Sequence, residues 1–276
     1  VNNHAHVMKP NEEFHIDYLT PFLESLDYTL LNSGTAQPKL NKQTCFKIKV
    51  LKPPLPEQKA IAKVLSDMDN LITALEAEIE KMRLVKQGAM QELLSAGDDW
   101  EVRSLGEVCD VSTGSKNNQD KTENGEYPFF VRSQNVEKIN TYTFNCEAIL
   151  IPGEGGIGKI YHYINGKFDV HQRVYCIRNF FENISGKYVY LYMKKKFNIH
   201  AMRNSVKATV DSLRLPTFLE FEIPFPTYEE QTRIAKILTD IDLTIGSKEA
   251  ELEKYRAMKV GLMQALLSGK RRLVRG

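Results

Sequence analysis

The sequence predicts an α/β protein in which α/β domains are joined by two long helices that form an antiparallel coiled coil. The first observation is a repeat: the 39 residues of Glu57–Ser95 recur as Glu230–Ser268, at an offset of 173 residues with 22 identities. The second is the stretch between the copies, residues 98–226, where short apolar runs alternate with turn signals as in a separate α/β domain. Chance does not produce a gapless repeat of this length, so the two copies should adopt the same structure.

Each copy of the repeat predicts one long helix, over residues 54–97 and 227–270. Apolar residues follow one another at alternating spacings of four and three, which is the seam of a coiled coil. The first seam is Ile61, Leu65, Met68, Ile72, Leu75, Ile79 and Met82, and the second is Ile234, Leu238, Ile241, Ile245, Leu252 and Tyr255. Two matching seams favour pairing of the helices with each other over packing of each on its own domain. At ~1.5 Å per residue, each helix would span roughly 58 Å.

Residues 98–226 predict a separate, complete α/β domain. We expect strands at 127–132, 148–152, 159–164, 167–177 and near 218–225, with a helix at 185–197. Asn165-Gly166 predicts a type I′ hairpin turn between two of these strands.

The flanks of the chain extend the repeat. Residues 1–53 keep the offset of 173, which places Val1 opposite about Val174, so they correspond to only the second half of such a domain. We expect that half to leave strand edges and apolar surface uncovered in residues 1–50. Residues 271–276 form a basic tail.

Composition excludes several classes of protein. Of the 276 residues 42% are hydrophobic and 26% charged, which is typical of a globular chain. No signal peptide and no apolar run of the ~20 residues that cross a bilayer is visible, so we expect no membrane partner. The four cysteines form no CxxC pair and the six histidines no HxxxH pair, so we expect no metal site and a reducing, cytoplasmic location. A formal charge of +2 means that anion binding depends on a local patch.

Gly153–Gly158 matches the pattern GxGxxG, which raises the alternative of a dinucleotide-binding enzyme. Such a site needs a helix directly after the glycines, whereas Lys159–Ile164 alternates like a strand. We therefore expect a glycine loop without a cofactor. The repeated pairs Asp67/Asp69 and Asp240/Asp242 lie on the predicted helices, and no catalytic residue is expected.

Two segments of the complete domain have the composition of a nucleic-acid interface. Residues 187–214 contain seven basic residues interleaved with tyrosines, and the loop 112–125 is rich in Ser, Asn, Gln, Lys and Gly. Basic side chains suit phosphates, whereas Asn, Gln and Arg can form paired hydrogen bonds with base edges. We expect Lys195 and Lys196 to contact phosphates, and Arg173, Gln172 or Asn118 to reach bases. The full candidate set is Lys116, Asn117, Asn118, Gln119, Lys121, Lys159, Gln172, Arg173, Lys194, Lys195, Lys196, Lys207 and Thr209.

These features together resemble the DNA-specificity (S) subunit of type I restriction–modification systems. The resemblance is carried by the repeated Pro-x-x-Glu-Gln-x-x-Ile-Ala-Lys-x-Leu of residues 54–65, whose second copy at 227–238 begins with Thr, and by the helix ends Met90–Ser95 and Met263–Ser268. It extends to the opening Trp100–Val108 and to Asp169–Arg173. It covers essentially the whole chain. The departure is the start, where the family's first target-recognition domain is represented by its second half only.

The resemblance implies a non-catalytic subunit whose target-recognition domains bind half-sites in double-stranded DNA. Its conserved spacer helices would hold these domains apart and dock two methyltransferase subunits, with restriction subunits joining through the complex. S-adenosylmethionine, ATP and Mg would be used by those partners, for adenine methylation and DNA cleavage, and no cofactor is expected in this chain. The alternative from a different class is a coiled-coil adaptor that binds no DNA.

Overall fold

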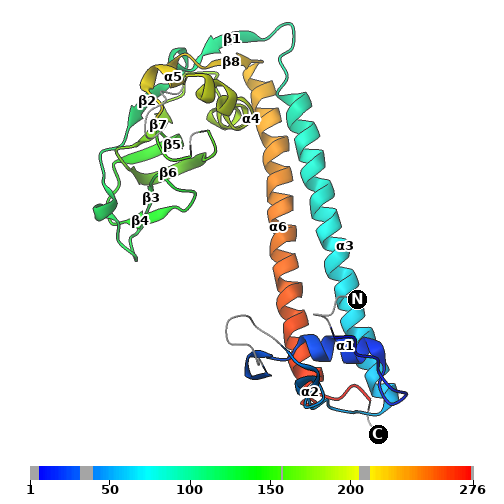
Figure 1. The fold of residues 1–276 in the computed structure, drawn as a ribbon. Helices are drawn as coiled ribbons and strands as arrows, with labels where there is room; N and C mark the ends of the chain where they lie inside the picture. The colour runs from blue at the N-terminus through cyan, green and yellow to red at the C-terminus, as the bar shows by residue number, and fades with distance from the viewer. Residues whose placement is uncertain (1–5, 32–39, 157, 205–211, 275–276) are drawn as a thin grey trace. The chain divides into compact units, whose positions relative to one another are not determined.

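The computed structural model describes residues 6–31, 40–156, 158–204 and 212–274. The chain divides into two compact units, which are described separately: unit 1 comprises Val1–Arg83 and Leu243–Gly276, and unit 2 comprises Leu84–Asp242. Two long helices, α3 (Leu55–Leu93) and α6 (Tyr228–Leu266), contribute to both units (Figure 1). The predicted ranges 54–97 and 227–270 therefore contain the observed helices, each of which stops four residues earlier.

Unit 1 is helical in its described part. It contains α1 (Ile16–Glu24), the 3₁₀ turn η1 (Thr29–Leu31), α2 (Lys42–Cys45) and the adjoining segments of α3 and α6. Its core joins α1 to the start of α3 and the end of α6, and it consists of Tyr18, Phe22, Ile61, Ala62, Leu65, Leu266 and Leu267. The expectation of strand edges in residues 1–50 is wrong for the described residues 6–31 and 40–50, which contain helices and no strand. Apolar surface is nevertheless uncovered there, since Val7, Ile16 and Phe46 are exposed.

The C-terminal segment returns to the start of α3. Arg272 Nε lies 2.9 Å from Glu57 Oε1, and the Leu273 amide donates to the same oxygen at 3.0 Å. The Arg272 guanidinium lowers the pKa of the Glu57 carboxyl, which is buried. Arg272, one of the residues expected to form a basic tail, thus pairs with the buried carboxylate of Glu57.

Unit 2 is an α/β domain built on two sheets. Strands β1 (Glu101–Ser104) and β8 (Glu222–Phe225) form an antiparallel pair. The larger sheet has the order β2-β7-β5-β6-β3-β4, antiparallel except where β3 pairs with β6. Its strands are β2 (Asp110–Thr113), β3 (Tyr127–Phe130), β4 (Glu137–Ile139), β5 (Phe144–Pro152), β6 (His162–Val170) and β7 (Val174–Arg178). The turns η2 (Leu105–Glu107) and η3 (Asn118–Asp120) lie in its connections.

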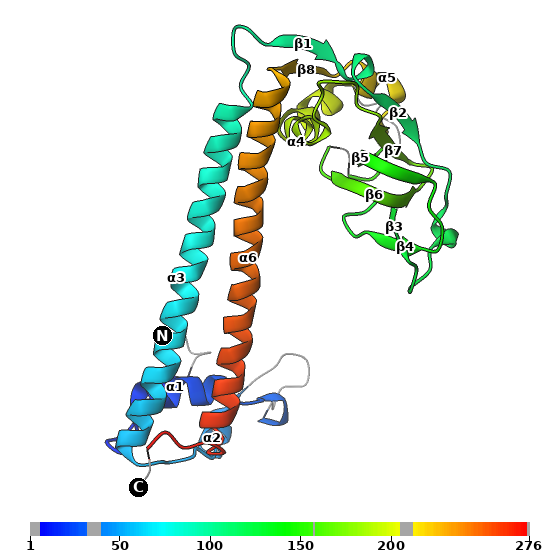
Figure 2. The same cartoon turned by 180° about the vertical axis from the view of Figure 1, so that it is seen from behind.

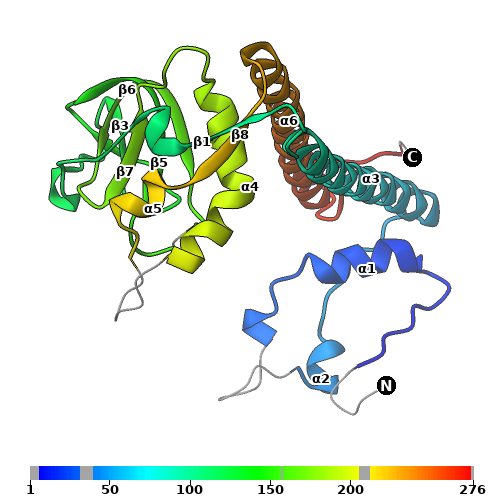
Figure 3. The same cartoon turned by 90° about the horizontal axis from the view of Figure 1, so that it is seen from above.

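Two helices cover this sheet, α4 (Gly186–Asn204) and α5 (Leu215–Leu219). Figure 3 shows α4 between the sheet and α6. The main core includes Ile149 and Ile151 of the sheet, Tyr188 and Phe197 of α4, and Ile234 of α6. The predicted helix at 185–197 is thus extended by one to two turns, and the strand expected near 218–225 is divided into a short helix and β8.

The hairpin predicted at Asn165-Gly166 is wrong. Strand β6 runs uninterrupted through both residues, which pair with Glu147 and Cys146 of β5. Gly166 has φ 148°, a value that side-chain-bearing residues rarely adopt but that leaves the strand intact. Pairing of residues 144–150 of β5 with β6 outweighs the local turn preference of Asn-Gly. The β5–β6 connection is instead the glycine loop at 153–161.

Within each unit the segments of α3 and α6 lie side by side and run antiparallel (Figure 2). The predicted seam residues are all buried or half-buried in the structure. Ion pairs flank the seams, and they are reciprocal between the repeats. Arg83 pairs with Glu249 at 2.6 Å, while the equivalent Arg256 pairs with Glu76 at 2.6 Å. Lys259 likewise pairs with Asp69, and the equivalent Lys86 with Asp242.

A buried glutamine fixes the start of each long helix. Gln58 Nε2 donates to the carbonyls of Glu13 and Pro53, and its Oε1 accepts from the His15 amide at 2.8 Å. Gln231 makes the same three bonds, with the Asn183 and Pro226 carbonyls and the Ser185 amide. Glu13 and Asn183 are 170 residues apart, as are His15 and Ser185, so the offset of 173 does not extend to residues 13–15. The expected constant offset of 173 through residues 1–53 is therefore wrong by three positions for these residues.

Candidate nucleic-acid interface

Two segments of unit 2 that are far apart in sequence are joined by main-chain hydrogen bonds. The Lys116 amide donates to the Val170 carbonyl at 3.2 Å, and the Gln172 amide donates to the Lys116 carbonyl at 2.9 Å. Gly114 makes this approach possible, because a Cβ at this position would lie 1.9 Å from the Val170 oxygen. The loop after β2 and the connection between β6 and β7 thus form one rigid edge.

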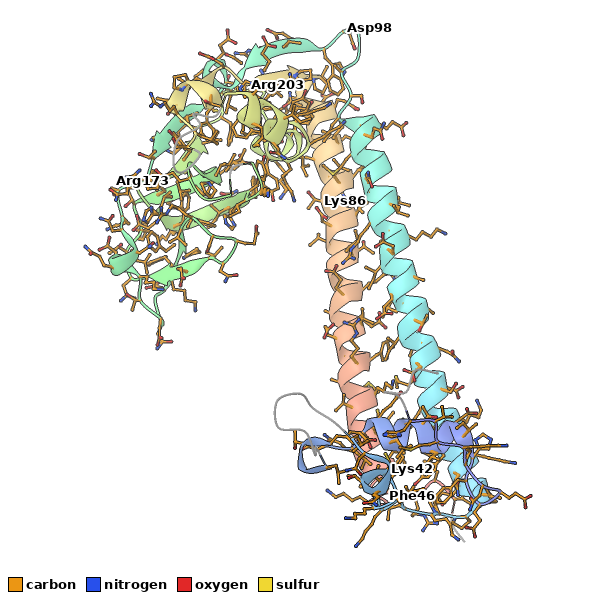
Figure 4. All side chains as sticks on the ribbon, in the orientation of Figure 1. Lys42, Phe46, Lys86, Asp98, Arg173 and Arg203 are labelled. Atoms are coloured by element: carbon orange, nitrogen blue, oxygen red, sulfur yellow. The ribbon has the colours of Figure 1, made fainter. Side chains whose placement is uncertain are left out.

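This edge holds an open polar pocket of about 380 Å³. Five of the sequence-predicted residues line it: Asn117, Asn118, Gln119, Gln172 and Arg173. Asn117 shapes the pocket, because its amide donates to Asp120 Oδ2 at 2.7 Å and its own Oδ1 accepts from Gln172 Nε2 at 2.6 Å. The η3 turn that follows leaves Asn118 and Gln119 exposed. In Figure 4, Arg173 lies on the opposite side of the unit from Lys86 of α3.

Three further side chains complete the pocket: Arg132, Glu154 and His171. Arg132 Nη1 lies 3.3 Å from Glu154 Oε2, and Arg173 Nη1 donates to Glu154 Oε1. The two arginines and one carboxylate leave a net positive charge. Lys116 adds a cation beside the pocket, 3.9 Å from the buried Asp169.

His171 presents a hydrogen-bond donor of fixed geometry. Its Nδ1 accepts from the Arg173 amide at 3.0 Å, so the neutral ring carries its proton on Nε2. Burial lowers the pKa of His171, and the nearby Arg132 and Arg173 lower it further, against the opposite effect of Glu154 and Asp120. The ring is therefore held in the neutral form that donates through Nε2.

The other predicted residues are dispersed. Lys121, Lys159, Lys194 and Lys196 are exposed, and Lys121 lies 3.6 Å from Glu137. Lys195 differs from its predicted role as a phosphate contact, because its Nζ donates to the carbonyls of Met90 and Gln91 at 2.9 and 3.1 Å. It stabilises the last turn of α3. Lys207 and Thr209 lie outside the described residues.

The tyrosines interleaved with the basic residues of α4 belong to the protein interior. Tyr188 is fully buried and donates to the Pro224 carbonyl at 2.6 Å. Tyr190 is half-buried and lies under the ammonium groups of Lys187 and Lys194, 5.1 and 5.4 Å from its ring centre. These tyrosines therefore contribute to packing, and their interleaving with basic residues is not a sign of a nucleic-acid surface.

The residues named as candidates from the sequence do not include Arg132, Glu154 and His171, although the range 153–173 expected to contact bases contains the last two. Arg132 ends the expected strand 127–132, and Glu154 stands between two glycines of the loop. His171 directly precedes two candidate residues, and that adjacency was a usable signal. Sequence separation hides the rest, since the pocket combines segments near positions 118, 132, 154 and 172.

The structure describes no helix after the glycine loop that could hold a pyrophosphate; the described residues lead from Lys159 into β6. No group of three or more His, Cys, Asp or Glu residues suited to a metal ion occurs in the described part of the chain. Its described helices include none long and apolar enough to cross a bilayer.

Comparison with solved structures shows that the fold is shared with known proteins. An S subunit of a type I restriction–modification system from M. genitalium has a TM-score of 0.70 at 18% identity, covering 92% of this chain and 73% of that one. The HsdS subunit from Thermoanaerobacter tengcongensis has a TM-score of 0.52 at 16% identity, covering 92% and 70%. The predicted α/β fold with two long helices is confirmed.

The sequence matches the family described as type I restriction modification DNA specificity domain over residues 1–81 and 97–254. The MjaVIII specificity subunit of Methanocaldococcus jannaschii is 30% identical over 280 residues, covering 87% of this chain and 66% of its own length. The EcoDI specificity subunit of Escherichia coli is 32% identical over 179 residues, covering 63% and 39%. The chain thus spans less than two thirds of these relatives' length.

The chain belongs to this specificity-subunit family. The resemblance stated from the sequence is confirmed, and the chain is classed with specificity subunits and not with enzymes.

Proposed function

We propose that this chain is the DNA-binding specificity subunit of a type I restriction–modification complex, and that the pocket of unit 2 contacts the bases of one half-site in double-stranded DNA. The observation that carries the proposal is the convergence of six amide and guanidinium side chains on one exposed edge of the sheet. These are the side chains that form paired hydrogen bonds with bases in the major groove. Lys121 and Lys116 would contact phosphates beside them.

The chemistry belongs to partner subunits in this proposal. Two methyltransferase subunits, using S-adenosylmethionine, would dock on the α3 and α6 segments and methylate adenine. Restriction subunits, using ATP and Mg, would join through the complex and cleave DNA. The whole assembly would act in the cytoplasm. This chain would contribute recognition and spacing, without a cofactor of its own.

The test uses the full chain co-expressed with methyltransferase subunits and a library of random duplexes, from which bound sequences are selected. We expect one sequence to be enriched, with an affinity that falls linearly on a log–log plot against salt concentration because phosphate contacts release counterions. Replacing Asn118 and Gln119 with Ala should reduce the enrichment. The matched control is Asn145→Ala, an exposed residue of β5 outside the pocket.

Failure of every duplex to bind, with the partner subunits still attached, would favour the coiled-coil adaptor. Unchanged enrichment in the double variant would still support DNA-sequence selection by this chain. It would show that the base contacts are made by residues other than Asn118 and Gln119.

A further inference from the structure

We propose that Glu154 is a positioning residue that holds Arg132 and Arg173 for contact with guanine, so that the half-site bound by unit 2 contains a G·C base pair recognised by this arginine pair. The inference rests on the proposed DNA-binding function and adds to it the base and the residues that select it. It also assigns a role to the glycine loop, which binds no cofactor in the proposed function: the loop positions Glu154.

The three side chains come from three separate segments and meet at one carboxylate. Arg132 follows β3, Arg173 precedes β7, and each donates through Nη1 to a different oxygen of Glu154. The glutamate lies deeper in the protein than the two arginines: 22% of the Glu154 side chain is exposed, against 43% of Arg132 and 56% of Arg173. The carboxylate therefore anchors the inner side of both guanidinium groups while their outer sides face solvent.

The glycine loop fixes Glu154 through the main chain. The Gly153 amide donates to the Arg173 carbonyl at 2.9 Å, and the Gly153 carbonyl accepts from the Leu213 amide at 2.8 Å. Glu154 itself forms an antiparallel bridge with Ser212. A Cβ on Gly153 would lie 2.9 Å from the Tyr175 ring, so only glycine fits directly before the acid.

The donor pattern selects the base. Each guanidinium has five N–H donors, and the hydrogen bonds found among the described residues use only Nη1 of each. Guanine presents two adjacent acceptors in the major groove, O6 and N7, which match two adjacent N–H groups. Adenine places a donor beside N7, cytosine presents a donor, and thymine a single acceptor beside a methyl group, so none of them accepts both. His171 Nε2–H adds a donor to the same pocket.

A phosphate is the competing ligand for two arginines. Glu154 argues against it, because a carboxylate between the two cations repels an anion but not a neutral base edge. The distinction is measurable, since a phosphate contact contributes equally to all sequences whereas a base contact contributes to one.

The variants are Arg132→Lys and Glu154→Gln in the full chain co-expressed with methyltransferase subunits. The matched controls are Arg103→Lys, half-buried on β1, and Glu123→Gln, exposed in the loop before β3. Both positions lie outside the pocket. The probes are the duplex selected from the random library and its single-base-pair variants. Affinity for each is measured over a range of salt concentrations.

We expect Arg132→Lys to weaken binding of the selected duplex roughly tenfold or more and to make one G·C position tolerant of other base pairs. The salt dependence should be unchanged, because the charge is kept. Glu154→Gln should relax selectivity at the same position without weakening binding to non-selected duplexes, an effect that a purely structural role would not produce. Both controls should behave as the wild type.

A selected half-site without a G·C pair, equal weakening on all duplexes, or variants identical to the wild type would overturn the inference. Each of these results counts against the inference when the wild-type complex itself selects a DNA sequence. A wild type that selects none would instead refute the proposed function.

Discussion

Tyr18 and Tyr188 make the same hydrogen bond in the two halves of the chain. Tyr18 Oη donates to the Leu51 carbonyl at 3.0 Å, and Tyr188 Oη donates to the Pro224 carbonyl at 2.6 Å. Leu51 and Pro224 each precede a proline of the repeat, Pro53 or Pro226, by two residues. Unit 1 and unit 2 thus use one design to attach a helix to the start of a long helix, although unit 1 has no sheet in its described part.

The buried glutamines should be equally important in the two units. Replacing Gln58 or Gln231 with Leu leaves two carbonyls and one amide without partners, so we expect each change to lower the free energy of unfolding by about 2–4 kcal/mol. Denaturant unfolding of each variant measures this. Gln91→Leu, at an exposed position of α3, should stay within ~0.5 kcal/mol of the wild type. A cost for one glutamine and none for the other would show that the repeats are not equivalent.

The seam of the long helices should be sensitive to cavities. Ile79 is 3% exposed in unit 1, and Ile79→Ala should lower the free energy of unfolding by about 2–5 kcal/mol. The control is Leu84→Ala, since Leu84 is 59% exposed on the same helix. Equal stability of both variants would contradict the assignment of Ile79 to a packed seam.

Lys195 and Lys196 are neighbours with different expected roles. Lys195→Met removes the donor to two carbonyls of α3, so we expect a loss of about 1–2 kcal/mol in the free energy of unfolding and an unchanged salt dependence of DNA binding. Lys196→Met should leave stability nearly unchanged and reduce the salt slope by ~1, if this exposed lysine contacts a phosphate. Thermal unfolding and salt titration together distinguish them. A reduced salt slope in the Lys195 variant would contradict its structural role.

The stability of unit 2 should depend on the protonation of His171. Its pKa in the folded protein is lowered from 6.5, so the unfolded state binds more protons as the pH falls through about 6.5. Stability should therefore decrease below that pH and become independent of this group below the folded pKa. His171→Gln should lose this part of the pH dependence in unfolding measured from pH 8 to 5. The other titrating groups remain in both proteins, so the difference between the curves isolates His171.

Local periodicity explains what could be predicted from the sequence. The seam of the first helix repeats every three or four residues, so the helix and its buried face followed directly from positions such as Leu65 and Ile79. The prediction of a turn at Asn165-Gly166 was wrong because it rested on the local turn preference of these two residues. The pairing of β6 with β5 that overrides this preference involves residues more distant in the sequence. Part of the pocket could be predicted from the sequence, because the side-chain types of Asn118 and Arg173 suit contacts with DNA bases. Arg132 and Glu154 could not be assigned to it, because only folding brings them to the same place.

Main-chain bonds between Lys116 and Gln172 hold the pocket edge, while the side chains of Asn118, Gln119 and Gln172 project from it. Exchanging these exposed side chains removes no buried contact. In the proposed function, substitutions at these surface positions would change the DNA sequence that is bound and leave the fold intact, whereas close approach of neighbouring atoms constrains Gly114 and Gly153 to glycine. One scaffold could then bind different DNA sequences at little cost in stability.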